Sequence, residues 1–317
     1  MMEPPRSRVA IIGAGNVGAS LAYALTIKGA VRELALINRS AEKAEGEVMD
    51  LGHAMAMSYP MQIDGGDSYE LCAGADIVVV TAGAAQGPGD TRLDLSRKNA
   101  AIVKDIVHRI LEHNPNPIII MVTNPVDVMT YVALKESGLP PERVISSGTV
   151  LDSARFRYLM AQHCRLDPRN LHCHVIGEHG DSELALWSRV NIAGVSLADF
   201  CTTCDRKCGK VDRENIERQV RESAYEIIDR KGSTAYGIGL ALVRIIRSIQ
   251  RDEESVLTVS SLVQGSYGIE HVCLSLPSIL GSTGVEGVLD APLAPEEEDA
   301  LKRSAAVLRE QIEQLGY

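Results

Sequence analysis

The segment Gly13-Ala14-Gly15-Asn16-Val17-Gly18 lies between an apolar run, Arg8–Ile12, and a stretch of helical periodicity, Asn16–Lys28. In this G-x-G-x-x-G pattern the first glycine permits a tight turn, and the second lets a pyrophosphate approach the backbone. The third lets the helix pack closely on the strand, and the positive amino end of the helix favours the phosphate charge. The strand–turn–helix setting therefore predicts a dinucleotide-binding site.

The first half of the chain alternates short apolar runs with amphipathic stretches. We expect strands at residues 8–12, 33–37, 76–81 and 117–123, and helices at residues 16–28 and 41–57. A further helix precedes the last of these strands, with an apolar face made of Ile102, Val103, Ile106, Val107 and Ile110. Apolar strands separated by helices indicate a parallel sheet covered on both faces. The expected fold class is α/β, beginning with a doubly wound, Rossmann-type parallel sheet.

The pattern changes beyond about residue 150, where the helical stretches become longer. Helices are expected at residues 151–164, 211–229, 234–250 and 295–315, and strands at residues 171–176, 255–262 and 271–280. A chain of 317 residues is also too long for one small core. We therefore expect an α+β substrate-binding domain at residues 149–317, after a dinucleotide-binding domain at residues 1–148.

The composition excludes several classes of protein. The chain has 32 Lys and Arg against 42 Asp and Glu, a net charge of −10, which disfavours general binding to nucleic acids and to anionic membranes. Residues 1–8 contain no apolar signal core, and every apolar run is far shorter than the ~20 residues that span a bilayer. Seven cysteines, an odd number without an export signal, indicate a reducing cytoplasm.

Three of the cysteines, Cys201, Cys204 and Cys208, have the spacing C-x2-C-x3-C. A zinc site normally needs four ligands, and no partner pair is evident nearby. Incidental surface thiols are therefore the favoured interpretation, and no metal is expected.

The residue that would bind the adenosine ribose departs from the usual pattern. An acid is expected about 20 residues after the glycines, at the end of the second strand, but Asn38 stands there, followed by Arg39 and Ser40. An amide does not repel a 2′-phosphate, and the arginine adds an attraction. We favour NAD as the cofactor, with Asn38 bonding the ribose hydroxyls, and hypothesise measurable use of NADPH.

A candidate proton carrier lies in the segment Ile176-Gly177-Glu178-His179-Gly180-Asp181. Upstream, Asp152 and Arg155 stand nearly one helical turn apart and could supply His179 with a carboxylate partner and a guanidinium. An imidazole held by a carboxylate is the usual proton carrier near neutral pH. Taken alone, however, a histidine between glycines is more often a turn or core residue.

Taken together, the motifs resemble the L-lactate/malate dehydrogenase family, and within it the bacterial L-lactate dehydrogenases. The resemblance covers essentially the whole chain. It is carried by Gly13 to Gly18, Thr81-Ala82-Gly83-Ala84-Ala85-Gln86, Thr91-Arg92-Leu93-Asp94-Leu95, Thr123-Asn124-Pro125-Val126-Asp127, residues 148–157, residues 177–181 and Gly232-Ser233-Thr234. So many motifs in the same order are far more specific than any one of them.

The resemblance implies a reaction and a set of catalytic residues. A hydride would pass between NAD(H) and pyruvate or L-lactate, with His179 as proton donor and Asp152 holding its ring. Arg155 would bind the substrate carboxylate, and Arg92, beyond the glycine- and proline-rich loop at residues 86–89, would polarise the ketone. Asn124 would bond substrate and cofactor, and Thr234 would line the side-chain pocket.

Further contacts with the cofactor follow from the same resemblance. In addition to Gly13, Gly15, Asn16, Val17, Gly18 and Asn38, these are Lys43, Tyr69, Gly83, Ala84, Val122, Asn124 and Ser147.

Gln86 is expected to select the substrate. Malate dehydrogenases resemble this chain but carry an arginine here, which neutralises the second carboxylate of oxaloacetate. Beside Gln86 that carboxylate would be buried without a partner, which costs several kcal/mol, or ~10² to 10⁴ in selectivity. Pyruvate is therefore the expected substrate. The alternative is another L-2-hydroxyacid dehydrogenase that accepts bulkier 2-oxo acids, or malate.

Arg157 and His172 match positions that allosteric bacterial members use to bind fructose 1,6-bisphosphate across a subunit interface. Like charges from two chains repel one another until an anion neutralises them. The resemblance thus implies activation by fructose 1,6-bisphosphate, although both residues could instead be ordinary surface groups. It also implies a cytoplasmic homotetramer that ferments pyruvate to lactate.

Overall fold

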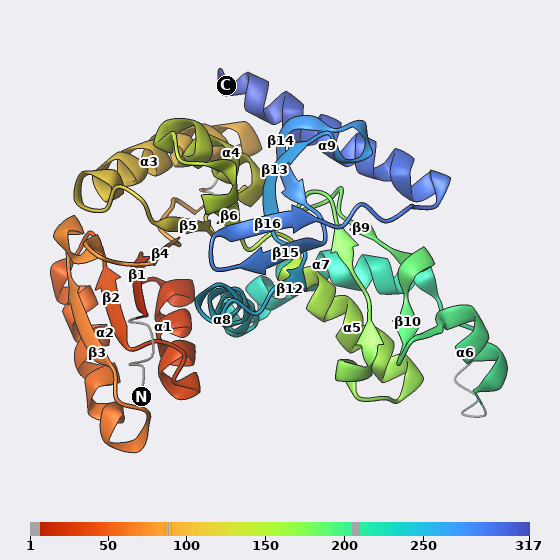
Figure 1. Cartoon of the computed structure of the whole chain (residues 1–317), viewed down its shortest axis with the longest axis horizontal. Coiled ribbons are helices and arrows are strands. Elements are labelled where there is room, and N and C mark those ends of the chain that lie inside the picture. Colours follow the sequence, from red (N-terminus) through yellow and green to blue (C-terminus); the bar gives the residue numbers. More distant parts are fainter. Residues whose placement is uncertain (1–6, 86, 88, 90, 205–209) are drawn as a thin grey trace.

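The structure is a computed structural model that describes residues 7–85, 87, 89, 91–204 and 210–317. Its main element is an eight-stranded sheet in the order β14-β13-β6-β5-β4-β1-β2-β3 (Figure 1). The strands are β1 (Arg8–Ile12), β2 (Glu33–Ile37), β3 (Gln62–Gly66), β4 (Ile77–Val80), β5 (Ile118–Met121), β6 (Val144–Ser146), β13 (Ser260–Gln264) and β14 (Glu270–Ser275). The first six are parallel, and β13 and β14 extend the sheet antiparallel beyond β6.

Helices cover both faces of this sheet, as the apolar strands predicted. Successive residues of β1 enter two different cores: Val9 and Ile11 lie in one, and Ala10 and Ile12 lie in the other. The first core receives α1 (Asn16–Lys28) and α8 (Tyr236–Gln250), and the second receives α3 (Arg92–His113), α4 (Val126–Ser137) and α9 (Pro295–Gln314). Helix α2 (Ala41–Ala54) packs beside β3. The doubly wound architecture is therefore confirmed.

The later part of the chain adds three small antiparallel sheets and a third core. The sheets have the orders β11-β10-β7, β12-β15-β16 and β8-β9. Their strands are β7 (Leu171–His172), β8 (Val175–Ile176), β9 (Leu184–Ala185), β10 (Asn191–Ile192), β11 (Val195–Ser196), β12 (Ser255–Leu257), β15 (Ser278–Gly281) and β16 (Gly284–Val288). The third core joins α5 (Val150–Cys164), α6 (Leu197–Thr203) and α7 (Arg213–Lys231), with the Phe156 and Trp187 rings 4.7 Å apart.

Three strands predicted from the sequence are wrong in the same way. The run at residues 171–176 is broken into β7 and β8, which pair with β10 and β9. The runs at residues 255–262 and 271–280 each divide between the small β12-β15-β16 sheet and the main sheet. An apolar run marks buried backbone without showing where the chain changes partner, which explains the error.

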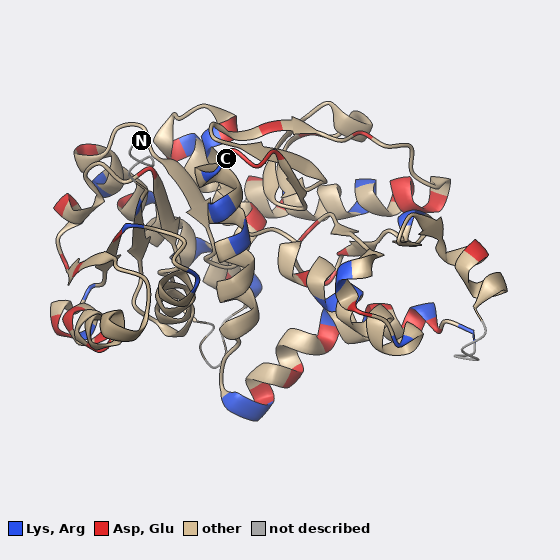
Figure 2. Ribbon diagram, turned by 60° about the horizontal axis from the view of Figure 1, so that its bottom comes forward, with Lys and Arg blue, Asp and Glu red and all other residues tan. Residues whose placement is uncertain are grey.

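The remaining features concern the surface. Acidic and basic residues are interspersed along the helices (Figure 2). Ion pairs such as Arg218–Glu222 and Lys302–Glu298 join residues one helical turn apart. Within the described ranges, no helix is both long and apolar enough to cross a membrane.

Candidate active site

The glycine turn has the geometry that a dinucleotide requires. Gly13 has φ +112°, and a Cβ there would lie 2.6 Å from Oγ1 of Thr81. A Cβ at Gly18 would lie only 1.8 Å from the carbonyl oxygen of Gly13, so α1 can approach β1 only with glycine at this position. A Cβ at Gly15, in contrast, would meet no atom within 4 Å. The turn is therefore closely packed at Gly13 and Gly18 but leaves free space at Gly15, where a pyrophosphate could approach the backbone.

Asn38 and Asn16 tie this turn to its surroundings. Oδ1 of Asn38 accepts a hydrogen bond from the Ala14 amide at 3.2 Å, and its Nδ2 donates to the carbonyl of Ser40 at 3.2 Å. Asn38 thus braces the turn, and Arg39 beside it is exposed. Nδ2 of Asn16 lies 2.9 Å from Oγ of Ser233, which brings the segment before Thr234 to the start of α1. Thr234 itself is half-buried.

The other predicted cofactor residues lie around the carboxyl edge of the sheet. The amides of Val122 and Ser147 bond the ends of β4 and β5, at 2.9 Å to Val80 and 3.1 Å to Met121. Tyr69 is 9% exposed beneath the Arg109 guanidinium, 4.0 Å from its ring centroid, and Lys43 is exposed in the first turn of α2. Ligands of open parallel sheets bind at this edge.

Asn99, which the sequence analysis missed, joins two of the predicted residues. Its Oδ1 accepts a hydrogen bond from the Ala84 amide at 2.7 Å, and its Nδ2 donates to the carbonyl of Asn124 at 2.7 Å. A Cβ at the adjacent Gly83 would lie 2.4 Å from the Thr123 side chain, which explains the glycine. Asn99 is 1% exposed on the apolar stripe of α3, and a polar residue in that stripe was the available signal.

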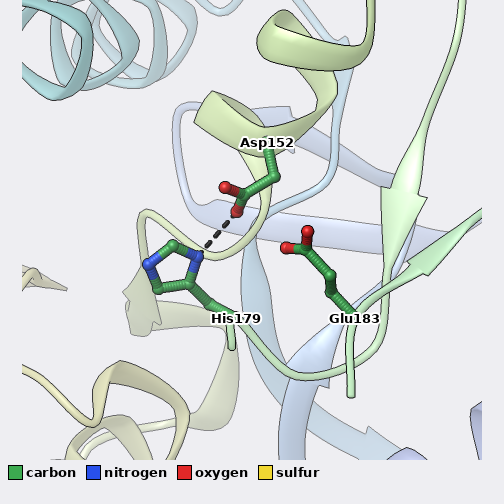
Figure 3. Close-up of side chains that lie close together, drawn as sticks. All are labelled: Asp152, His179 and Glu183. Atoms are coloured by element: carbon green, nitrogen blue, oxygen red, sulfur yellow. Dashed lines mark hydrogen bonds and ion pairs between the residues drawn. The ribbon is translucent and has the colours of Figure 1, made fainter. Parts of the chain in front are cut away.

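Asp152 holds the two residues that were predicted beside it. Its Oδ2 lies 2.6 Å from Nδ1 of His179 (Figure 3). Its Oδ1 accepts a hydrogen bond from Nη1 of Arg155 at 2.7 Å. Asp152 is 1% exposed in the first turn of α5, and His179 follows β8 after Gly177 with φ +89°. The expected carboxylate–imidazole pair is therefore present, with a guanidinium attached.

A second carboxylate holds the backbone of His179. The His179 amide donates to Oδ2 of Asp127 at 2.7 Å, and Asp127 is 1% exposed in α4. Burial raises the pKa of Asp127 to about 6, although the neighbouring Ser260 hydroxyl and the His179 amide oppose this shift. The sequence analysis quoted Asp127 in a motif but assigned it no role, because its partner lies 52 residues away.

The charges around His179 favour its protonated form. The carboxylate of Asp152 raises the pKa of His179 to about 9, although burial of the imidazole opposes this shift. Burial alone would raise the pKa of Asp152, but His179 and Arg155 together lower it below its ordinary value. At neutral pH, His179 is therefore an imidazolium and Asp152 a carboxylate, so His179 can donate a proton.

Glu183 is a third ionisable group in this cluster and was also missed. Ligand-type atoms of Asp152, His179 and Glu183 all lie within 4.8 Å of one another. Burial, and then the Asp152 carboxylate, raise the pKa of Glu183 to about 8. Arg155 already supplies a positive charge to Asp152, so we interpret the cluster as a proton-holding network.

Arg92 is the first residue of α3 and contacts the segment that follows His179. Its Nη2 contacts Oδ2 of Asp181, and the Tyr225 hydroxyl donates to Oδ1 of the same carboxylate at 3.2 Å. The helix start is fixed by a capping box between Thr91 and Asp94. Gln86 and position 88 of the expected loop lie outside the described residues, as do position 90 and Cys208 of the cysteine cluster.

Arg157 and His172, which are expected to bind an activator, are not part of the His179 cluster. They lie near His174 instead. Nε of Arg157 donates to the carbonyl of Cys173 at 3.1 Å, and His172 is exposed at the end of β7. Burial, and then the charges of Arg157 and His172, lower the pKa of the intervening His174 to about 4.

Comparison with known proteins agrees with this geometry. Residues 7–146 match the NAD binding domain of lactate/malate dehydrogenases, and residues 149–316 match their alpha/beta C-terminal domain. The chain is 50% identical over 309 residues to an L-lactate dehydrogenase of Thermoanaerobacterium saccharolyticum (98% of this chain, 99% of the relative). It is 53% identical over 306 residues to one of Nitratidesulfovibrio vulgaris (96% and 99%).

Solved structures show the same similarity. A lactate dehydrogenase from a Medee basin deep-sea metagenome library superposes with a TM-score of 0.95 at 43% identity, over 98% of this chain and 99% of the other. The minor L-lactate dehydrogenase of Enterococcus mundtii gives a TM-score of 0.93 at 39% identity, over 98% of each chain. As its ordered motifs predicted, the chain belongs to the lactate/malate dehydrogenase family, and its cofactor is NAD.

Proposed function

We propose that this protein is a NAD-dependent L-lactate dehydrogenase, which interconverts pyruvate and L-lactate. The observation that carries the proposal is the buried Asp152 carboxylate, shared between the half-buried side chains of His179 and Arg155. A binding protein that merely retained the fold would have no use for a proton donor held beside a carboxylate-binding guanidinium. The identity of about half the residues with bacterial L-lactate dehydrogenases supports the same conclusion.

Each residue has a defined task in this reaction. Bound NADH supplies the hydride to the ketone carbon. His179 donates a proton from Nε2 to the ketone oxygen, while Asp152 stabilises the imidazolium through Nδ1. In the described part of the chain, Nε and Nη2 of Arg155 make no hydrogen bond, so both can bind the substrate carboxylate. In the reverse direction neutral His179 accepts the proton of the L-lactate hydroxyl.

Arg92 is proposed to leave Asp181 when the substrate is bound and to face the ketone oxygen as negative charge develops there. Its side chain is 70% exposed, so the exchange requires little desolvation. Asn124, held by Asn99, would bond substrate and cofactor, and Thr234 would line the pocket for the substrate side chain.

Gln86 is the basis for choosing pyruvate, since a neutral amide leaves the second carboxylate of oxaloacetate without a partner. The second candidate within the same class is an L-2-hydroxyacid dehydrogenase for bulkier 2-oxo acids or for malate.

The test is a substrate panel with purified protein. Reduction of pyruvate, oxaloacetate and longer 2-oxo acids is measured with NADH, and the His179→Gln variant serves as the matched control. We expect pyruvate to have the highest kcat/KM and His179→Gln to lose at least ~10² in kcat, in the range of general acid catalysis. A higher kcat/KM for oxaloacetate or for a longer 2-oxo acid would contradict the proposal.

Regulation by fructose 1,6-bisphosphate is proposed at Arg157 and His172. Nε of Arg157 bonds the carbonyl of Cys173, the residue that follows His172 in the chain, and this contact supports a shared anion site. We expect millimolar fructose 1,6-bisphosphate to lower the KM for pyruvate, more strongly at mildly acidic pH if protonated His172 takes part. An unchanged KM, or an equal effect on Arg157→Gln, would refute this proposal.

We further propose a cytoplasmic homotetramer that serves fermentation. Exposed apolar side chains on α1 and α8, including Tyr23, Ile27 and Leu240, support self-association, because such patches usually mark interfaces. Light scattering of the purified protein tests the tetramer, and a monomer at micromolar concentration would contradict it.

A further inference from the structure

Glu183 approaches the catalytic pair from outside the helix that carries Asp152. It lies four residues after His179 and just before β9, with its amide donating to the carbonyl of Gly180 at 3.2 Å. Its carboxylate is directed toward Asp152, and the three groups have ligand-type atoms within 4.8 Å of one another (Figure 3). Among the described residues its side chain has no hydrogen-bond partner, so its influence is electrostatic.

The groups around this cluster come from three helices. Asp152 and Arg155 of α5 and Arg221 of α7 act on Glu183, while Asp127 of α4 acts on His179. Oδ1 of Asp152 forms an ion pair with Nη1 of Arg155 at 2.7 Å. Oδ2 of Asp127 accepts a hydrogen bond from the His179 amide, whereas the Glu183 carboxylate accepts none from the described residues.

We propose that Glu183 is a third ionisable residue of the active site, acting through His179 by holding its imidazolium protonated in alkaline solution. The inference rests on the proposed dehydrogenase function and adds a residue to it. A negative charge within a few ångströms of an imidazolium, and shielded from water, strongly favours the protonated ring.

Both groups change charge in alkaline solution. The pKa of Glu183 is raised to about 8, chiefly by burial, and the pKa of His179 to about 9, chiefly by Asp152. An ionised Glu183 makes the deprotonation of His179 less favourable, and a protonated His179 favours the ionisation of Glu183. Because the two sites interact, the observed midpoints belong to the pair.

Removal of the Glu183 charge should move both directions of catalysis to lower pH. Pyruvate reduction needs protonated His179, so in Glu183→Gln it should decline at a pH about one unit lower than in the wild type. L-lactate oxidation needs neutral His179, so the rate of this reaction should also begin to rise at a pH about one unit lower. Glu183→Asp retains the charge and should keep both midpoints close to those of the wild type.

The experiment combines pH profiles of kcat/KM in both directions with a titration that needs no turnover. In protein with ¹³C-labelled histidine, the His179 resonance is assigned by its loss in His179→Gln, and its pKa is measured in each variant. Glu222→Gln is the matched control, since it removes an exposed, ion-paired carboxylate from α7. It should leave the His179 titration unchanged.

A lower His179 pKa in Glu183→Gln, with both profiles shifted in the same direction, would support the inference. An unchanged His179 pKa would overturn it, as would rates that fall in both directions without a shift of either midpoint. Failure of the wild type to reduce pyruvate would instead overturn the proposed function. The titration of the His179 resonance requires no turnover, so it would still test the role of Glu183.

Discussion

The backbone amide of His179 donates a hydrogen bond to the buried carboxylate of Asp127 at 2.7 Å. Asp127 belongs to α4, which packs on the main sheet, whereas His179 follows β8 in the later part of the chain. This bond fixes the main chain of the proposed proton donor, while Asp152 fixes its ring. Two carboxylates from two helices thus determine where the imidazole lies.

Asp127→Ala should lower kcat for pyruvate reduction by about 10- to 100-fold, because a buried amide without an acceptor costs ~1–3 kcal/mol. Asp127→Asn retains an acceptor oxygen and should lose much less activity. Steady-state kinetics and circular dichroism of both variants check the prediction. Equal losses in the two variants would show that the hydrogen bond to His179 is not the reason for the effect.

Asn99→Leu should raise the KM for NADH as well as lower stability. It leaves the Ala84 amide and the Asn124 carbonyl without the bonds that Asn99 provides. Asn114→Leu is the control, since Asn114 is also buried, at the end of α3, but bonds the carbonyls of Cys72 and Ala75. We expect both variants to melt earlier and only Asn99→Leu to bind NADH more weakly, by about tenfold or more. Equal NADH affinities in the two variants would contradict this assignment.

The unfolding free energy should fall as the pH rises from about 6.5 to 9. The pKa of His179 is raised from 6.5 to about 9 in the folded protein, so its stabilising effect is complete below 6.5 and lost through 9. The contribution is at most about 3 kcal/mol. Urea unfolding of the wild type and His179→Gln at pH 6 and pH 9 checks this, and the pH effect should be smaller in the variant. Identical pH effects would disprove the assignment to His179.

Gln86→Arg should shift the substrate preference from pyruvate toward oxaloacetate. The introduced guanidinium would pair with the second carboxylate, and the expected change in the ratio of kcat/KM values is ~10² to 10⁴. Gln86→Met, which introduces no charge, is the control. If Gln86→Arg gains no oxaloacetate activity relative to pyruvate, the role given to this position is incorrect.

Use of NADPH should be measurable, because Asn38 and the exposed Arg39 place no carboxylate where a 2′-phosphate would lie. Asn38→Asp should reduce NADPH use by electrostatic repulsion. The variant keeps an acceptor oxygen for the Ala14 amide but loses the hydrogen bond that Nδ2 donates to the Ser40 carbonyl. The measurement is kcat/KM for NADH and NADPH in both proteins. A wild-type preference for NADH above ~10³ would refute the hypothesis.

Much of the fold could be predicted from local sequence. The glycine turn was recognisable because Gly13 must adopt φ +112° and Gly18 must leave room for a backbone oxygen. The sheet was recognisable because strands such as β4, apolar at every position, must be buried on both faces. Asp152 and Arg155 were recognisable because their spacing of three residues brings side chains together on any helix.

Other features depended on contacts between distant segments. The sequence did not indicate that β13 pairs with β6, that residues 171–176 divide between two sheets, or that Asn99 joins Ala84 to Asn124. It did not reveal the pairing of Asp127 with His179 across 52 residues, nor the approach of Glu183 to Asp152.

The sequence by itself therefore determined the turn, the parallel sheet and the types of residue available for proton transfer. Local backbone geometry and periodicity depend only on neighbouring residues, so they can be inferred from the chain. The tertiary structure decided which carboxylates surround His179, and hence the direction of its pKa shift. Electrostatic energy depends on distance and burial, and packing of segments far apart in sequence sets both.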